Sequence, residues 1–304
     1  MALAHALIHR RRRDWLPAVA VAVVVVVLGL VSQPSDKTAT EEVSVACVQA
    51  ETFNHHDYVQ LTTQAVEHPS KPKFVVLPEH TILDYADENH HLVKSLAGLA
   101  RDHGVYICVG VHTRAPEDAE CDYDNVALLI GPSGSIIGRQ AKAVPLPFFV
   151  DGNPAESQEV IDTDVGPVGM YICYDGNFTD ITRRLVKLGA GLLLVPVMNP
   201  EGWPAQQRWQ QANIARFRSI ESRRWSVRAA SSGVSQIVDS DGRIRQQRSR
   251  DEGPGILYGT VHVNDERTAF SQGGHLFALV VGVVYLIVVA WLTVVDWRRR
   301  FSAR

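Results

Sequence analysis

The chain has 304 residues, of which 46% are hydrophobic, enough for one folded domain of roughly 230 residues with short flanking segments. Its net charge is -3, and no basic stripe is interleaved with aromatic residues, so we predict no nucleic-acid partner. Charged residues are concentrated in the middle of the chain and at its two ends. Two stretches are almost free of charge, and they indicate where the protein resides.

The first uncharged stretch covers residues 16–31 and follows a basic block at residues 10–13. As a helix it would reach about 24 Å, short for a bilayer but workable. A secretory signal sequence also has a basic block followed by an apolar stretch, but residues 31–33 form a poor cleavage site. We therefore predict an uncleaved transmembrane helix or signal anchor over residues 15–32, preceded by a cytoplasmic basic tip at residues 1–14.

The second uncharged stretch covers residues 276–295 and matches the hydrocarbon thickness of a membrane. Trp291 and Trp297 lie near its end, and a basic tail follows at residues 298–304, as at a membrane interface. A buried core helix is the alternative, but such helices are seldom apolar on every face over this length. We predict a transmembrane helix over residues 276–297.

Basic residues lie at the outer end of both predicted spans, so the positive-inside rule places both termini in the cytoplasm. The segment between the spans would then be extracytoplasmic, on the outer side of a cell (inner) membrane. We predict a linker at residues 33–42 and a connector at residues 265–275. In an oxidising compartment a disulfide between Cys108 and Cys121 is an open alternative.

Short β-rich runs alternate with helical stretches between linker and connector, which is an α/β pattern. The predicted strands cover residues 43–49, 74–78, 105–112, 125–131, 135–140, 168–173, 191–197, 227–232, 235–240 and 243–248. The predicted helices cover residues 57–67, 88–102, 179–188 and 205–222. Turn signals at residues 132–134 and 241–242 predict two β-hairpins.

Cys173 ends an apolar strand and is followed by Tyr174-Asp175-Gly176-Asn177 and then a helix. A strand-to-helix elbow lifts a side chain to the rim of a sheet, and the helix N-terminus favours a thiolate, so we expect a lowered thiol pKa. The alternative is a buried, inert cysteine.

Glu79 and Lys142 also follow predicted strands. A carboxylate such as Glu79 commonly caps a turn, but at the rim of a cleft it could act as a general base with a pKa raised by burial. A lysine such as Lys142 is ordinarily at the surface, but the apolar segment after it, residues 144–149, favours a dry cleft. There the ammonium would stabilise a thiolate or an oxyanion.

Glu79, Lys142 and Cys173 occur in this order, each in the loop after a strand. Here the chain resembles the carbon-nitrogen hydrolase (nitrilase) superfamily, in the segments VACVQ, VVLPEH, YICYD, LVKLGAGLLLVPVMNP and ANIARFRSIESRR and in the lysine after GRQA. The resemblance implies an α-β-β-α sandwich over residues 43–264. It also implies a catalytic triad of Glu79 as general base, Lys142 as stabiliser of the oxyanion and thiolate, and Cys173 as nucleophile.

Within this superfamily the chain resembles the apolipoprotein N-acyltransferases, through the tryptophan segment at residues 199–203 and through residues 267–277, which lead into the last apolar helix. That resemblance implies a phospholipid acyl donor and a lipoprotein amine as acceptor. Trp203 would then border the acyl cleft, unless it only packs in its loop. Those enzymes have a glutamate eight residues after the lysine; Val150 stands there, and the neighbouring Asp151 is the candidate replacement.

The predicted chemistry is acyl transfer through a thioester on Cys173, with the backbone N–H of Tyr174 as a second oxyanion donor. If the thioester forms from a small amide and water attacks it instead, the enzyme is an amidase, and a third alternative is a non-catalytic protein that binds lipid or lipoprotein.

Two histidine pairs, at residues 55–56 and 90–91, have side chains that diverge within each pair. We therefore predict no metal and no cofactor.

Overall fold

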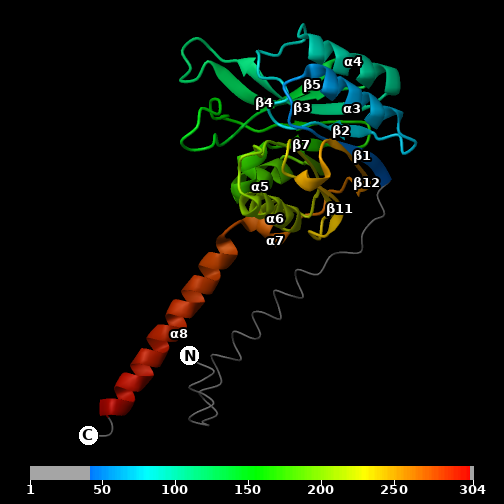
Figure 1. The fold of residues 1–304 in the computed structure, drawn as a ribbon. Coiled ribbons are helices and arrows are strands. Elements are labelled where there is room, and N and C mark those ends of the chain that lie inside the picture. Colours follow the sequence, from blue (N-terminus) through cyan, green and yellow to red (C-terminus); the bar gives the residue numbers. More distant parts are fainter. Residues whose placement is uncertain (1–41, 302–304) are drawn as a thin grey trace. The chain divides into compact units, whose positions relative to one another are not determined.

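The computed structural model describes residues 42–301 and divides the chain into two compact units, one of which covers residues 39–272 (Figure 1). The other unit contains the C-terminal residues from 273 onward. The predicted helix over residues 15–32 and the predicted linker over residues 33–42 lie outside the described residues, apart from residue 42.

The larger unit contains two six-stranded mixed sheets. The first has the strand order β12-β1-β2-β3-β4-β5, with β1, β2 and β3 parallel and the flanking strands antiparallel. Its strands are β1 (Glu42–Gln49), β2 (Phe74–Val76), β3 (Tyr106–Arg114), β4 (Tyr123–Ile130), β5 (Ile136–Ala141) and β12 (Gly255–His262).

The second sheet repeats this plan in the order β11-β10-β9-β8-β7-β6, with β7, β8 and β9 parallel. Its strands are β6 (Val160–Ile161), β7 (Val168–Met170), β8 (Leu192–Val197), β9 (Trp225–Ala230), β10 (Val234–Val238) and β11 (Ile244–Ser249). Because the carboxyl ends of parallel strands share an edge of their sheet, each sheet gathers its strand-end loops on one side.

Alternation along the strands separates two cores. In β2, Phe74 and Val76 point into the core between the sheets, whereas Val75 points into an outer core. The outer core is closed by α3 (His55–Glu67) and α4 (His91–His103), the latter through residues such as Leu92, Leu96 and Ala100. On the second sheet, α5 (Thr179–Lys187) and α6 (Ala205–Ser222) lie against β7 and β10 respectively, so both sheets of this α/β fold are covered by helices.

The predicted helices and hairpins are present with small shifts of their ends, but two strands were missed. β12 pairs with β1 along its whole length, yet Gly255 and Gly259 interrupt its apolar pattern. Gly259 faces Ile237 and Gln246, and an added Cβ would approach both side chains too closely. β6 is too short to produce a pattern.

The C-terminal unit is dominated by α8 (Leu276–Phe301), preceded in the chain by α7 (Ala269–Gly273). Within the described residues, the segment Ala278–Arg298 is the one helix whose length and composition would allow it to cross a membrane. The predicted span at residues 276–297 coincides with this helix.

All four cysteines are free thiols. Cys108 lies in the core between the sheets, where its Sγ is 3.6 Å from Met170 Sδ. Cys121 lies in the loop before β4, with its Sγ 3.9 Å from Asp122 Oδ1. The structure therefore does not contain the Cys108–Cys121 disulfide that the sequence left open.

Gly110 lets β3 approach the segment that carries Glu79. A Cβ at this position would lie 2.4 Å from Glu79 Cα and 2.7 Å from Pro78 O. We expect Gly110→Ala to lower the free energy of unfolding by about 1–3 kcal/mol and to displace Glu79, because overpacking shifts the backbone. Chemical denaturation measures the first effect.

Gly98→Ala in α4 is the matched control, since nothing lies within 4 Å of its added Cβ. We expect this change to raise stability by about 0.5–1 kcal/mol through helix propensity. Equal effects of the two changes would contradict a steric role for Gly110.

Candidate active site

Three loops after strands bring Glu79, Lys142 and Cys173 together. Glu79 follows β2, Lys142 directly follows β5, and Cys173 follows β7 and begins the 3-10 helix η2 (Cys173–Asn177). All three side chains are buried. Residues separated by 63 and 31 positions in the sequence thus form one cluster.

The Glu79 carboxylate accepts three hydrogen bonds. Lys142 Nζ donates to Oε1 at 2.7 Å, Asn125 Nδ2 donates to Oε1 at 2.8 Å, and the backbone N–H of Met198 donates to Oε2 at 2.7 Å. Burial raises the pKa of Glu79, but the charges of Lys142 and His80 oppose this, and the pKa lies below its ordinary value. Glu79 is therefore ionised at neutral pH.

Lys142 lies between two carboxylates, with its Nζ 2.7 Å from Glu79 Oε1 and 2.6 Å from Asp151 Oδ2. Burial lowers the pKa of Lys142, but Glu79, Cys173 and Asp151 raise it, so the pKa lies above its ordinary value. Asp151 also accepts the backbone N–H of Leu146 at 2.7 Å. The structure thus brings Asp151 into the cluster despite its short side chain.

The Cys173 backbone has φ +46°, in the left-handed region that non-glycine residues seldom adopt. Its Sγ lies 3.5 Å from the Met198 carbonyl oxygen and accepts a hydrogen bond from Gln211 Nε2 at 3.1 Å. Burial raises the pKa of the Cys173 thiol to about 12, the Glu79 carboxylate adds to this rise, and Lys142 opposes it.

Both pKa expectations from the sequence were wrong in direction. We expected a lowered pKa for the thiol and a raised pKa for Glu79, but burial beside Glu79 raises the former and the cations beside Glu79 lower the latter. The resting cluster consequently holds a neutral thiol next to an ionised carboxylate. In these protonation states the thiol can only donate a proton and the carboxylate can only accept one.

Asp175 ties the cysteine turn to the lysine loop. Its carboxylate accepts backbone N–H groups from Ile172 at 3.0 Å, Ala143 at 3.1 Å and Val144 at 2.8 Å. Burial raises the pKa of Asp175 to about 6, although these N–H groups lower it in part. One side chain therefore fixes the backbone on both sides of the cluster.

Tyr174 and Trp203 have different positions relative to the cluster. Tyr174 is the second residue of η2, where backbone N–H groups lack partners inside their own helix. Trp203 closes a turn through its N–H to Pro200 O at 3.0 Å, and its carbonyl oxygen accepts from Arg208. Among the described residues, Trp203 makes no hydrogen bond or ring contact with Glu79, Lys142 or Cys173.

Three further groups in the cluster were not predicted from the sequence. Asn125 bridges Glu79 and Asp151 through Nδ2, at 2.8 and 2.9 Å. Gln211 reaches the sulfur from α6, and Met198 contributes only its backbone. Polar residues at the start of a strand or within a helix are ordinarily at the surface, so only the tertiary arrangement identifies these groups.

His80 adjoins both carboxylates, with its Nε2 3.6 Å from Glu79 Oε1 and 3.5 Å from Asp151 Oδ1. These three residues have the donor types of a metal site. Lys142 already supplies a positive charge to both carboxylates, however, so the arrangement fits an ammonium better than an added metal ion.

His55, His90 and His91 converge, which the sequence reasoning missed, and the rings of His90 and His91, which were expected to diverge, have their centroids 4.4 Å apart. His55 Nδ1 lies 2.8 Å from His91 Nε2, and His90 lies beside both rings. His90 already uses both nitrogens, because Nδ1 accepts the N–H of Leu92 and Nε2 lies 3.1 Å from Asp84 Oδ2. A hydrogen-bonded pair explains the contact between His55 and His91 without a metal.

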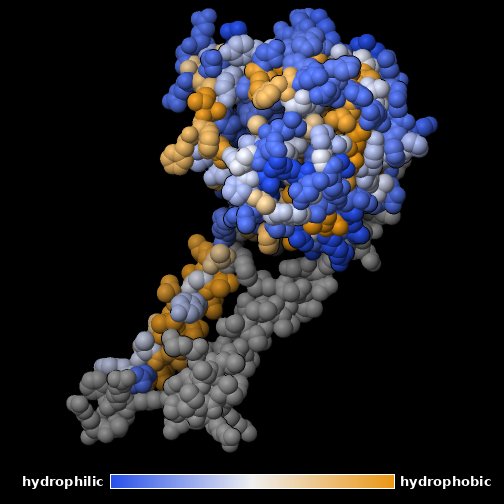
Figure 2. Space-filling model, viewed as in Figure 1, coloured by the Kyte–Doolittle hydropathy of each residue, from blue (hydrophilic) through white to orange (hydrophobic). Residues whose placement is uncertain are grey.

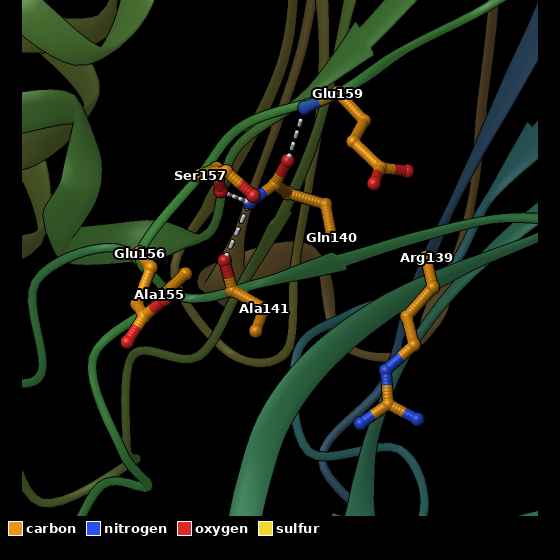
Figure 3. A pocket seen from close by; sticks show the side chains of 7 residues that line it. All are labelled: Arg139, Gln140, Ala141, Ala155, Glu156, Ser157 and Glu159. Atoms are coloured by element: carbon orange, nitrogen blue, oxygen red, sulfur yellow. Dashed lines mark hydrogen bonds between the residues drawn. The ribbon is translucent and has the colours of Figure 1, made fainter.

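A recess of about 280 Å³ lies beside β5, outside this cluster (Figure 3). Gln140 spans it: Oε1 accepts the N–H of Glu159 at 2.9 Å, and Nε2 donates to the carbonyl oxygens of Ala141 and Ser157 at 2.8 and 3.2 Å. The recess is lined by Arg139, Gln140, Ala141, Ala155, Glu156, Ser157 and Glu159. Since these hydrogen bonds join β5 to the following segment, Gln140 has a structural role.

We expect Asp175→Ala to lower the free energy of unfolding by about 3 kcal/mol, because it leaves buried N–H groups of Ile172, Ala143 and Val144 without an acceptor. It should also slow any reaction at Cys173. Asp162→Ala is the matched control: this carboxylate is exposed, and a change within about 0.5 kcal/mol is expected. Thermal and chemical unfolding measure the stability of both variants. Equal losses of unfolding free energy in the two would contradict the role of Asp175.

The chain is similar in sequence to acyltransferases and to amidases. Apolipoprotein N-acyltransferase of Geobacter metallireducens is 28% identical over 225 residues, covering 67% of this chain and 43% of that protein. Deaminated glutathione amidase of mouse is 26% identical over 215 residues, covering 62% and 64%. The chain thus spans less than two thirds of the length of either relative.

Solved structures show the same fold. A branch 10 member of the nitrilase superfamily from Saccharomyces cerevisiae has a TM-score of 0.65 at 20% identity, covering 75% of this chain and 93% of its own. An amidase from Nesterenkonia sp. has a TM-score of 0.59 at 18% identity, covering 77% and 95%. The family model described as carbon-nitrogen hydrolase matches residues 44–269. The chain therefore belongs to the carbon-nitrogen hydrolase (nitrilase) superfamily of enzymes.

Proposed function

We propose that the protein is a membrane-anchored acyltransferase that forms a thioester on Cys173 and passes the acyl group to an amine. The observation that carries this proposal is the buried contact of Glu79 with Lys142 at 2.7 Å, beside the strained turn that presents Cys173. A carboxylate, an ammonium and a thiol in one buried cluster are suited to covalent acyl transfer.

In the first step, Glu79 takes the thiol proton, and the sulfur attacks the carbonyl carbon of the acyl donor. The tetrahedral intermediate collapses, the bond to the leaving group breaks, and the proton on Glu79 passes to the leaving oxygen or nitrogen. In the second step, a neutral amine attacks the thioester and loses a proton to Glu79, the carbon–sulfur bond breaks, and the proton passes from Glu79 to the released sulfur. The cycle thus ends with the thiol and the carboxylate restored.

Lys142 and the backbone N–H of Tyr174 stabilise the oxyanion in this proposal. The ammonium has three N–H groups, and two carboxylates engage it at 2.7 and 2.6 Å, so one N–H remains for substrate. Each such donor contributes roughly 3 kcal/mol of transition-state stabilisation in comparable sites.

A phospholipid is the acyl donor that we favour, with a lipoprotein N-terminal amine as acceptor. The 28% identical acyltransferase supports this choice, and so does the apolar helix α8 (Figure 2). The segment after Lys142 adds support, because Phe148, Phe149 and Val150 are 102%, 63% and 79% exposed. Exposed apolar residues of this kind favour contact with lipid.

The proposed topology has two spans, at residues 15–32 and 276–297, in the cell membrane. The catalytic domain, residues 43–264, would face away from the cytoplasm, and both termini would face it. The basic residues at the outer end of each span support this orientation. In this proposal Trp203 borders the acyl cleft and Asp151 replaces the glutamate of related acyltransferases.

Hydrolysis of a small amide is the second candidate function. The mouse deaminated glutathione amidase favours it, because the chain matches 64% of that protein but only 43% of the bacterial acyltransferase. The same residues would act, with water in place of the amine.

The first step can be tested by trapping the acyl-enzyme. We expect the full chain in phospholipid micelles to gain one fatty acyl group on the Cys173 peptide, detectable by mass spectrometry and removable by hydroxylamine, as a thioester is. Glu79→Gln should slow acylation by about 10²–10⁴-fold and Lys142→Met by about 10²–10³-fold. Cys173→Ala controls for acylation elsewhere.

Acylation by a small amide but not by phospholipid would replace the acyltransferase proposal with the amidase. No adduct from either donor, together with an unaltered cellular phenotype of Cys173→Ala, would favour a non-catalytic role. Loss of lipoprotein N-acylation after gene deletion would identify the acceptor.

The rate of acyl-enzyme formation should depend on pH only in acid. Glu79 acts as a carboxylate, and its pKa lies below the ordinary 4.5, so this carboxylate is lost only as the pH falls through this lowered value. Lys142 stays charged because its pKa lies above the ordinary 10.5. Asp175, whose pKa is about 6, also gains a proton in acid, so we expect a constant single-turnover rate only between about pH 7 and 9.

His80→Gln should move this acid limb to higher pH, because the charge of His80 lowers the pKa of Glu79. An activity limb with its midpoint near neutrality in the unaltered protein would show that another group limits the reaction.

A further inference from the structure

Gln211 contacts the Cys173 sulfur from α6, apart from the groups that follow the strands. Its Nε2 lies 3.1 Å from Sγ. A glutamine amide has a donor end and an acceptor end, and only the donor end stabilises a thiolate. What fixes the orientation of this amide therefore decides its effect on the sulfur.

Arg228 on β9 fixes that orientation. A guanidinium only donates, and Arg228 Nη2 lies 3.0 Å from Gln211 Oε1 and 3.2 Å from Asn199 Oδ1. Asn199 must then present its Nδ2, which donates to Gln211 Oε1 at 2.5 Å. Two donors thus hold the oxygen of Gln211, and its nitrogen faces the sulfur.

Arg228 also supplies a buried positive charge that is not ion-paired with a carboxylate of the described residues. Its side chain is 2% exposed, its third hydrogen bond is to the carbonyl oxygen of Val234, and within residues 42–301 it forms no ion pair. Lys142, by contrast, is shared by two carboxylates at 2.7 and 2.6 Å. The cluster therefore contains one cation that is already neutralised and one that is not.

We propose that Gln211, oriented and polarised by Arg228, is a catalytic hydrogen-bond donor to the Cys173 sulfur. The proposal rests on Cys173 being the nucleophile. Gln211 touches the reacting atom, and Arg228 and Asn199 are positioning residues. Burial lowers the pKa of Arg228, but a guanidinium remains protonated in proteins.

This donor acts at two points of the reaction. A hydrogen bond to an anionic sulfur is stronger than one to a neutral thiol or thioester. Gln211 therefore stabilises the thiolate as Glu79 removes its proton, and again as the thioester releases it. An interaction that is stronger in the transition state than in the ground state accelerates the chemical step.

The test measures alkylation of the Cys173 peptide by iodoacetamide across a pH series, using the full chain and mass spectrometry. The thiolate displaces iodide, so the rate reports the thiolate fraction. Three charged groups act on the thiol directly, namely Glu79, Lys142 and Arg228. His80, Asp151 and Asp175 contact Glu79, Lys142 and the cysteine turn respectively, and all six groups remain in the first variant.

Gln211→Glu keeps the volume of the side chain and an oxygen for Arg228, but places a second oxygen against the sulfur. We expect alkylation to slow at least tenfold at pH 8, which corresponds to one pKa unit of the thiol. The defect should shrink as the pH falls and the new carboxyl gains a proton that it can donate. Gln210→Glu, an exposed neighbour in α6, should leave the rate unaltered.

Asn199→Asp tests Arg228 without changing a side chain that touches the sulfur. The carboxylate of the new aspartate neutralises the Arg228 guanidinium. It also lacks the N–H that Asn199 donates to Gln211 Oε1, so alkylation should again slow. If Gln211→Glu does not fold, Gln211→Asn replaces it, because the shorter amide retains Arg228 but cannot reach the sulfur. A change of less than threefold in the folded Gln211 variant overturns the proposal, and a larger fall supports it.

Acyl-enzyme trapping on the same samples distinguishes the two proposals. If the unaltered chain forms no acyl group on Cys173, the proposed function fails, whatever the alkylation rates. If it forms one and the Gln211 variants alkylate and acylate at unaltered rates, only the role of Gln211 and Arg228 fails.

Discussion

The buried ammonium of Lys142, held between Glu79 and Asp151, is the interaction on which the rest of the cluster depends. A charge with so little exposure persists only with partners, and removal of one partner of such a pair costs about 3–5 kcal/mol. The loops after β2 and β5 and the segment that reaches Asp151 must therefore meet at one point. This requirement sets the positions of Glu79, Lys142 and Asp151 and makes the pKa shifts of Glu79 and Lys142 opposite in sign.

Backbone geometry imposes the second constraint. Cys173 adopts a strained conformation at φ +46°, and such strain persists where surrounding contacts determine it. Asp175 provides these contacts, because its carboxylate accepts N–H groups from both the cysteine turn and the residues after Lys142. The same hydrogen bonds that stabilise the turn thus fix the distance between the thiol and the ammonium.

The sequence predicted the elements that have strong periodicity and the site residues that follow strands. Glu79, Lys142 and Cys173 were identifiable because each follows a predicted strand and because their order resembles that of the superfamily. β12 was not, since Gly255 and Gly259 remove the alternation that identifies a strand. Asn125, Gln211 and Arg228 could not be found, because an amide or guanidinium gains its role only from partners distant in sequence. The pKa directions failed for two different reasons: the charges of Lys142 and His80 lower the pKa of Glu79 against the effect of burial, and burial raises the pKa of the Cys173 thiol.

In the proposed function, the acceptor that reaches the thioester decides between transfer and hydrolysis, and the ion pair also bears on this choice. Asp151 Oδ2 binds both Lys142 Nζ and the N–H of Leu146, at 2.6 and 2.7 Å. The second contact closes residues 146–151 into a loop. That loop presents Phe148 and Phe149 to the exterior. The contact that neutralises Lys142 therefore also positions the apolar surface beside it, so the charge balance of the site and its access to lipid depend on one carboxylate.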